Sequence, residues 1–212
     1  MAQHWREGLS VNSEPLAEPS TREGIIMAEL VAACVVHELR PDAGSVGVTA
    51  IDKRPVSGPV RVRKLGLHAD VQASRKYHGG ELQALYVYAQ EDAEYWENEL
   101  GRPLDAGWFG ENLRVSGLDV SGARVGERWM IGPTVIVEVT SPREPCATFA
   151  RWVGGPDERG WVKRFAAARR TGLYLRVVKA GEIVAGDTIE VIDVPAGAPT
   201  ITEVFVGTAA AG

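Results

Sequence analysis

One cysteine stands in an unusual local sequence. Cys146 lies in the run SPREPCATF (residues 141–149), directly after a strand pattern over residues 134–140. Pro145 cannot continue a strand but suits the first position of a helix, where no backbone N–H is needed. We therefore expect Cys146 in the first turn of a short helix, three residues from Arg143. A helix start and a nearby cation favour thiolate, which binds soft metals and attacks electrophiles.

The alternative for any cysteine is a structural role, because a thiol packs as a small hydrophobic group. Cys34 fits that alternative, since it lies in the apolar run AACVV (residues 32–36). Two cysteines in a chain of this length do not form a disulfide framework, so both thiols are expected to be reduced.

A second candidate is the short run His78-Gly79-Gly80. The glycines permit positive φ and close approach of the backbone to a ligand. His78 can donate a hydrogen bond to an oxo group or a phosphate, or shuttle a proton near neutral pH. Asp70 and Gln72 are placed to orient this loop. The alternative is a turn that carries a hydrogen-bonded surface histidine.

The composition is that of a globular domain. The chain has 212 residues, 45% of them hydrophobic and 24% charged, with a formal net charge of −5. That charge argues against a general nucleic-acid binder, and no apolar run is long enough to span a bilayer. The start of the chain lacks a continuous apolar signal segment, so we expect a cytoplasmic protein that is not bound to a membrane.

The elements that must position these residues are mostly strands. Residues 1–27 are expected to be a flexible tail, with Met27 as a possible native start, residues 28–195 one domain, and residues 196–212 a short C-terminal tail. Strand patterns cover residues 29–36, 46–51, 60–65, 82–88, 113–115, 125–131, 134–140, 172–178 and 188–194. A hairpin connection is expected at residues 54–59, and short helices at residues 91–100, 147–153 and 161–168. This density of strands favours a mainly β, closed barrel with short peripheral helices.

Seven segments together resemble the MOSC family, the domains found at the C-terminus of molybdenum-cofactor sulfurases and in stand-alone bacterial proteins of the YiiM type. The resemblance runs from about residue 30 to 192. It is carried by GLHADVQA (66–73), YHGG (77–80), ALYVY (84–88), FGENL (109–113), VGE (125–127), SPREPC (141–146) and GLYLRV (172–177).

The resemblance implies a mostly antiparallel β-barrel, similar to the barrel of pyruvate kinase. It also implies binding of the molybdenum cofactor, with Cys146 as metal ligand or sulfur carrier. Relatives of this kind are linked to sulfur transfer and to reduction of small N-hydroxylated compounds. They work with an electron-donor reductase or a cysteine desulfurase as partner. Pyridoxal phosphate belongs to a separate sulfurase domain and is not expected in this chain.

Molybdopterin carries a phosphate, so its pocket needs fixed cationic donors. The candidates are Arg143, Arg176, Lys163, Arg164, Arg169 and Arg170. Asn112 is a candidate hydrogen-bond partner of the pterin, and Glu111 a candidate acid or base. The alternatives are a solvated cationic face and a buried loop whose polar groups satisfy the backbone.

Three positions depart from the pattern of the family: Ala69, where glycine is frequent, Ser74, where aspartate is frequent, and Thr148, where lysine is frequent. The leading hypothesis is a molybdenum-dependent reductase of N-hydroxylated compounds. The rival hypotheses are a sulfur carrier that forms a persulfide on Cys146, and a barrel that acts as a non-catalytic binding module.

Overall fold

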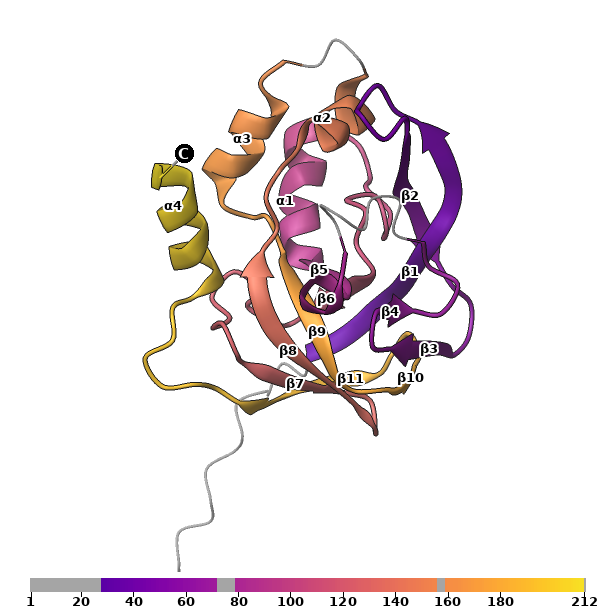
Figure 1. Cartoon of the computed structure of the whole chain (residues 1–212), viewed down its shortest axis with the longest axis vertical. Helices are drawn as coiled ribbons and strands as arrows, with labels where there is room; N and C mark the ends of the chain where they lie inside the picture. The colour runs from indigo at the N-terminus through magenta and orange to yellow at the C-terminus, as the bar shows by residue number, and fades with distance from the viewer. Residues whose placement is uncertain (1–27, 72–78, 156–158, 212) are drawn as a thin grey trace, which may run out of the picture.

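The computed structural model describes residues 28–71, 79–155 and 159–211. Its strands are β1 Ala28–Pro41, β2 Val48–Pro55, β3 Val60–Arg63, β4 Gly66–Leu67, β5 Leu85–Ala89, β6 Leu113–Ser116, β7 Arg128–Ile131, β8 Val135–Pro142, β9 Leu173–Lys179, β10 Gly181–Ile183 and β11 Thr188–Asp193. Its helices are α1 Gln90–Leu100, α2 Ala147–Gly154, α3 Trp161–Ala168 and α4 Ile201–Ala211, with a 3₁₀ turn at Glu81–Gln83 (Figure 1).

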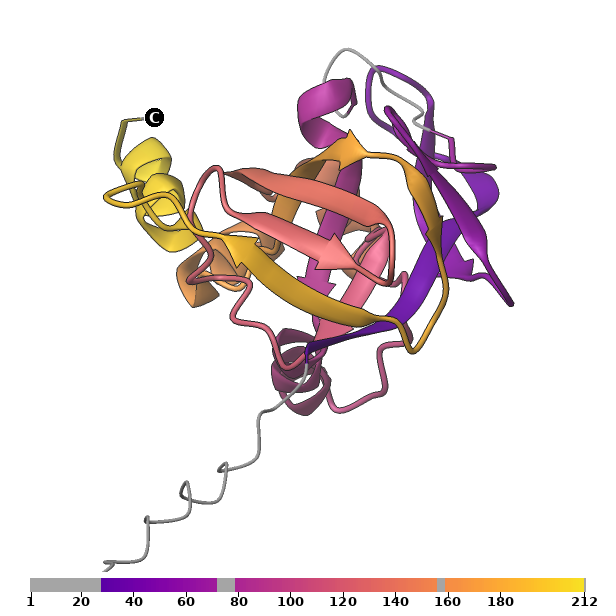
Figure 2. The same ribbon diagram turned by 90° about the horizontal axis from the view of Figure 1, so that it is seen from below.

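Seven strands close into a barrel. Their order is β11-β7-β8-β9-β5-β6-β1, and β11 pairs with β1 to complete the ring, which Figure 2 shows from below. All these pairs are antiparallel except β5 with β6, which α1 connects. The predicted closed, mostly antiparallel barrel with short peripheral helices is therefore confirmed. Closure removes the exposed strand edges that an open sheet would present.

Strand β1 is longer than predicted and extends past the barrel. Its first half pairs with β11 and β6, while residues 34–41 pair with β2. The β1–β2 hairpin therefore continues the sheet beyond the barrel, toward α2 (Figure 1). This overhang forms one wall of the cavity described below.

Two predicted elements were wrong. Residues 54–59 do not form a hairpin connection, because β2 pairs with β1 while β3 pairs with β10 and β4 in a separate small sheet. The predicted strand over residues 82–88 begins with the 3₁₀ turn and becomes extended at Leu85. In both places local propensity was overridden by long-range pairing, which sequence periodicity does not report.

The barrel wall separates two hydrophobic cores, and β5 contributes to both. Leu85, Val87 and Ala89 face the aliphatic core inside the barrel, whereas Tyr86 and Tyr88 face an aromatic core under the helices. All five are buried because successive side chains of a strand point to opposite faces and both faces are covered. The aromatic core also contains Trp96, Phe109, Phe149, Trp161 and Phe165.

A buried ion pair fixes the loop that leads into β6. Arg114 and Glu111 are 1% and 0% exposed, and Nε and Nη2 of Arg114 donate to Glu111 Oε1 at 2.9 and 2.6 Å. The same oxygen accepts the N–H of Gly107 at 2.7 Å. Glu111 therefore connects the loop to Arg114. This agrees with the alternative stated for Glu111 above, a buried loop whose polar groups satisfy the backbone.

The C-terminal segment packs on the barrel. Helix α4 contacts β8, and its residues Ile201 and Phe205 are buried. The N–H of Ile201 donates to the carbonyl of Ala123 at 2.8 Å. The segment expected to be a short C-terminal tail thus contains an eleven-residue helix. No helix of the described residues is long and apolar enough to cross a membrane.

We expect Arg114→Met to lower the free energy of unfolding by about 3–5 kcal/mol, because it leaves the Glu111 carboxylate buried without its cation. Denaturant titration measures this loss. Arg61→Met is the matched control, since the Arg61–Glu182 pair is 67% and 57% exposed and exposed pairs contribute little. Equal losses in the two variants would contradict the proposed role of the buried pair.

Candidate functional site

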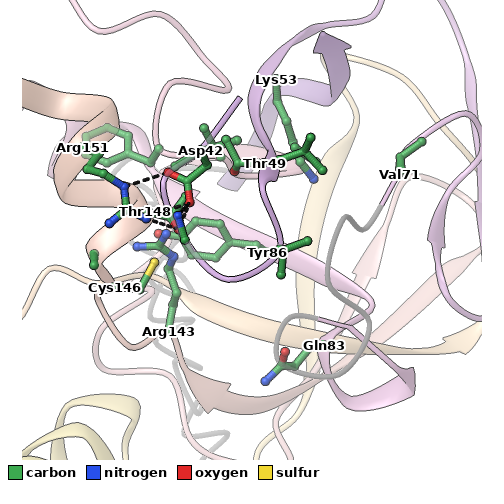
Figure 3. Close-up of a pocket in the computed structure, with 18 of the residues that line it drawn as sticks. Asp42, Thr49, Lys53, Val71, Gln83, Tyr86, Arg143, Cys146, Thr148 and Arg151 are labelled. Atoms are coloured by element: carbon green, nitrogen blue, oxygen red, sulfur yellow. Dashed lines mark hydrogen bonds and ion pairs between the residues drawn. The ribbon is translucent and has the colours of Figure 1, made fainter. Parts of the chain in front are cut away.

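A cavity of about 430 Å³ opens between the β1–β2 hairpin, the start of α2 and the outer face of β5 (Figure 3). Its polar lining comes from Asp42, Ser45, Thr49, Lys53, Asp70, Gln83, Asn112, Arg143, Cys146, Thr148, Arg151 and Tyr174. Its apolar lining includes Val46, Val48, Ile51, Val71, Tyr86 and Phe109. Segments from both halves of the chain therefore meet at one concave site, the usual form of a ligand pocket.

Cys146 lies at this cavity and is partly exposed. It is the N-cap residue of α2, with extended backbone (φ −132°, ψ 166°), and its carbonyl accepts the N–H of Ala150 at 3.1 Å. The prediction that Pro145 is the first helical residue was wrong by two residues, because the helix begins at Ala147, as the expected helix over residues 147–153 has it. The reason is that the backbone of Cys146 is still extended, so the first residue with helical geometry is Ala147.

Arg143 is the buried cation of the cavity. Its side chain lies over the ring of Phe149, with 4.6 Å from Cζ to the ring centroid, and over Tyr86 at 5.1 Å. The residue is 7% exposed, and its buried Nη1 has no hydrogen-bond partner within the described residues. Stacking on two rings stabilises the guanidinium and fixes its plane, while Nη1 keeps an unused donor.

Two tyrosines accompany Arg143. The Tyr86 hydroxyl donates to the carbonyl of Thr171 at 2.8 Å, and burial raises its pKa well above the usual range. Burial also raises the pKa of Tyr174, and the neighbouring Arg143 guanidinium opposes that rise. Both phenols therefore keep their protons at neutral pH and present uncharged hydroxyl groups next to the cation.

Lys53, Asp70 and Asn112 form a second polar group in the cavity wall. Lys53 Nζ lies 2.7 Å from Asp70 Oδ2, and both side chains are nearly buried (9% and 7% exposed). Asn112 Nδ2 donates to the same oxygen at 2.8 Å, and Asn112 Oδ1 accepts the N–H of Tyr86 at 3.1 Å. The N–H of Val36 donates to Asp70 Oδ1 at 3.0 Å. These bonds engage both oxygens of Asp70 and the amide of Asn112, so the two side chains hold Lys53 in place.

A third polar group joins the β1–β2 hairpin to α2. Asp42 accepts hydrogen bonds from Arg151 Nε at 2.8 Å, from Arg151 Nη2 at 2.7 Å and from the Thr148 hydroxyl at 3.1 Å, as Figure 3 shows. The bonds from Arg151 hold the pKa of Asp42 below its usual range. Thr148, a departure from the family pattern, thus contributes to an interaction that spans the cavity rim.

The charges of the cavity do not cancel. Lys53 is paired with Asp70, and Arg151 with Asp42, whereas Arg143 forms no ion pair with any described residue. One excess positive charge therefore faces a partly enclosed space next to Cys146. Such an arrangement favours the binding of an anionic group in the cavity.

The remaining predicted residues lie elsewhere. Arg176 forms a bidentate ion pair with Glu138 on the barrel, at 2.7 and 2.8 Å. Arg164 lies over Trp161, with 4.9 Å from Cζ to the ring centroid, and Lys163 is exposed on α3. Arg170 pairs with Asp92, and Arg169 is exposed where α3 ends. None of these five cations lines the cavity in the part of the chain that the structure describes.

Gly79 and Gly80, predicted to bind the cofactor, do not line the cavity, and Gly79 contacts the lining residue Gln83. The N–H of Gly79 donates to Gln83 Oε1 at 3.1 Å, and Gly80 has φ 87°, the left-handed conformation that glycine permits. Ala69 also has a positive φ of 71°, so the glycine common at this position would be less strained than alanine. His78, Gln72 and Ser74 lie outside the described residues.

Sequence reasoning missed Lys53, Asp42 and Arg151. They belong to no motif that we identified, and they come from a hairpin and from the second turn of α2. The helical spacing of Thr148 and Arg151 does place both on one face of α2. Their shared partner is separated from Arg151 by 109 positions, so periodicity alone does not reveal it. Within the described residues, no group of three or more His, Cys, Asp or Glu side chains is placed to hold a metal ion.

Comparison with known proteins decides the family. The sequence model described as "MOSC domain" matches residues 74–190, more than half of the chain. This chain belongs to the MOSC family. The crystal structure of YiiM from Geobacillus stearothermophilus is 30% identical, with a TM-score of 0.67, and the match covers 84% of this chain and 82% of that one. The predicted resemblance to the MOSC family and to its YiiM-type members is thereby confirmed.

Two curated relatives are longer than the region they share with this chain. "Uncharacterized protein YflK" of Bacillus subtilis is 34% identical over 144 residues, which are 68% of this chain and 63% of that protein. "Reductase" of Gibberella moniliformis is 30% identical over 183 residues, which are 84% of this chain and 31% of that protein. The chain thus spans less than two thirds of the length of either relative.

We expect the Asp42–Arg151 pair to stabilise the fold in a pH-dependent manner. Because the native pKa of Asp42 is lowered, its contribution is fully present above the unfolded value of about 3.9 and is lost as the pH falls through the lower native value. The difference in unfolding free energy between wild type and Asp42→Asn is therefore largest near neutral pH and shrinks in acid. Denaturant titrations over a pH series measure it, and a difference that grows below about pH 4 would contradict the assignment.

Proposed function

We propose that this MOSC protein binds the molybdenum cofactor and reduces N-hydroxylated small molecules. The observation that carries the proposal is one cavity that contains both the partly exposed thiol of Cys146 and the buried guanidinium of Arg143, whose Nη1 lacks a partner in the described structure. A soft thiolate is a suitable ligand for molybdenum. An unpaired, fixed guanidinium suits the phosphate of a pterin. The relative named "Reductase" supports a redox role.

Different residues of the cavity would bind different parts of the cofactor. Cys146 would ligate the metal, Arg143 would bind the phosphate, and Lys53 would add a second positive charge fixed by Asp70 and Asn112. The lining does not include Arg176, Lys163 or Arg164, so we assign these three cations no part in binding the cofactor. Nη1 of Arg143 shows that the cavity suits such a group. A buried donor without a partner is costly unless a ligand accepts its hydrogen bond.

When bound, the cofactor supplies the two-electron redox couple that this chemistry needs. Cleavage of the N–O bond of R–NHOH takes two electrons and two protons and yields R–NH₂ and water. The buried apolar lining from Ile51, Tyr86 and Phe109 would shield the organic part of a substrate from water. Tyr174 and the loop of His78 are candidate routes for protons, and a separate electron-donor reductase would return the electrons.

Sulfur transfer is the second candidate function. It is favoured by the same thiol, because a persulfide on Cys146 would be an anion next to the Arg143 guanidinium. A cysteine desulfurase would then be the donor partner. Sulfur transfer needs the partly exposed thiol but no metal, so the molybdenum content of the purified protein distinguishes the two functions.

We expect wild-type protein from a cofactor-competent host to contain near-stoichiometric molybdenum and Cys146→Ser to contain little, because a hydroxyl is a poorer ligand than a thiolate. Elemental analysis of the purified proteins measures this. Cys34→Ala is the matched control, since the Cys34 thiol is buried and does not line the cavity. Absence of molybdenum from wild type would overturn the proposal, and a trapped persulfide on Cys146 would then favour sulfur transfer.

We expect Arg143→Gln to reduce the affinity for the cofactor by roughly 10- to 100-fold, because it removes a charge-assisted hydrogen bond in a buried site. To measure the affinity, each protein is reconstituted at a series of cofactor concentrations, and the amount of bound cofactor is determined after its release. Arg176→Gln removes a cation that lies outside the cavity and is the control, with no expected change. Equal losses in both variants would show that the effect is one of overall charge.

A further inference from the structure

The orientation of α2 cannot come from the helix alone. It has eight residues, and its N-cap Cys146 makes no side-chain capping hydrogen bond. Helices this short are marginal in water and depend on tertiary contacts. Phe149 and Ala150 bury one face in the aromatic core, and the opposite edge of the first turns faces the β1–β2 hairpin through Thr148 and Arg151.

On the hairpin side, a single carboxylate makes those contacts. Asp42 accepts the three bonds from Thr148 and Arg151 and a fourth from the N–H of Gly44, at 3.0 Å. The Thr148 hydroxyl in turn accepts Arg151 Nη2 at 3.2 Å. The three side chains Asp42, Thr148 and Arg151 are called the clamp below. The bidentate arginine fork and the part-buried setting make it stronger than an ordinary surface ion pair.

The hairpin tip that carries Asp42 is internally ordered. The N–H of Asp42 donates to the carbonyl of Gly47, and the N–H of Gly47 donates to the carbonyl of Gly44, both at 3.0 Å. A Cβ on Gly44 would lie 2.7 Å from Asp42 Oδ2 and 3.2 Å from Arg151 Nη2. A side chain at position 44 would therefore press on Asp42 and Arg151 and force their charged ends to shift.

The far end of α2 is held by other contacts. Trp152 Nε1 donates to the carbonyl of Trp108 at 2.8 Å, and the guanidinium of Arg40 lies over the Trp152 ring, with 5.6 Å from Cζ to the centroid. Loss of the clamp would therefore leave the first turn of α2 held only on its core side, by Phe149, while the last turn keeps its contacts through Trp152. Cys146 is the N-cap residue that directly precedes that first turn.

We propose that Asp42 is a positioning residue for Cys146. It acts through Thr148 and Arg151, which hold the start of α2 against the hairpin so that the thiol faces the cavity at a fixed place. The proposal rests on the proposed function in one respect, that Cys146 is the metal ligand. The placement of the thiol itself is a property of the protein without any cofactor, so the two are tested separately.

The test is the rate at which iodoacetamide alkylates Cys146 in cofactor-free full-length protein, followed by mass spectrometry of the Cys146 peptide. We expect Asp42→Asn to change that rate by about fivefold or more, because it exchanges a charged fork for a weaker neutral contact. Gly44→Ala is expected to do the same without altering any charge. The double variant Asp42→Asn/Arg151→Met is expected to match the Asp42→Asn variant, since members of one network are not additive.

Asp187→Asn is the matched control, because its carboxylate also accepts a backbone N–H at a turn, that of Val184 at 2.8 Å, but outside the cavity lining. It is expected to leave the alkylation rate of Cys146 unchanged. Rates within twofold of wild type in folded Asp42→Asn and Gly44→Ala proteins would overturn the proposal.

Molybdenum content provides the second readout. If wild type holds molybdenum, Asp42→Asn is expected to hold less and Arg151→Lys, which keeps the charge but loses the fork, an intermediate amount. Molybdenum in Asp42→Asn equal to wild type would count against positioning of a ligand. If wild type holds none, the proposed function fails, and the alkylation rates still decide whether Asp42 places Cys146.

Discussion

The architecture depends on one long strand that pairs with three partners. The first half of β1 closes the barrel between β11 and β6, and its second half leaves the barrel to pair with β2. Without closure, β11 and β1 would be open edges. Without the overhang, the barrel would have no wall opposite α2. The same backbone hydrogen bonds that complete the fold therefore also create the cavity.

Burial decides how the charges in that cavity behave. In a partly enclosed site, unpaired charges are costly, and two of the three cations are accordingly matched by carboxylates. Arg143 is stabilised by the rings of Phe149 and Tyr86 instead. Ring faces attract a cation without consuming its hydrogen-bond donors, and this leaves the guanidinium able to bind an anion beside Cys146.

Rigid and adjustable contacts are separated within the site. Lys53 is held by a network whose carboxylate and amide are fully engaged, deep between β2 and the loop before β6. The Asp42 clamp lies nearer the rim, where Arg151 is 24% exposed. Because solvent competes more strongly at the rim, the start of α2 is the part of the cavity most easily altered by substitution or by acid.

Local chemistry in the sequence was enough to determine the strand-rich composition, the short helices and the special status of Cys146, because alternation, prolines and glycines act over a few residues. The density of strands also favoured a closed barrel, and the resemblance of seven separate segments added the family. The tertiary structure alone decided which cations share the cavity. Arg143 lies there, whereas Arg176 and Lys163 do not, and Lys53 and Arg151 were not anticipated. The reason is that a cavity is made by long-range pairing, here of a hairpin with a helix more than a hundred positions away, and one-dimensional patterns carry no information about such distances.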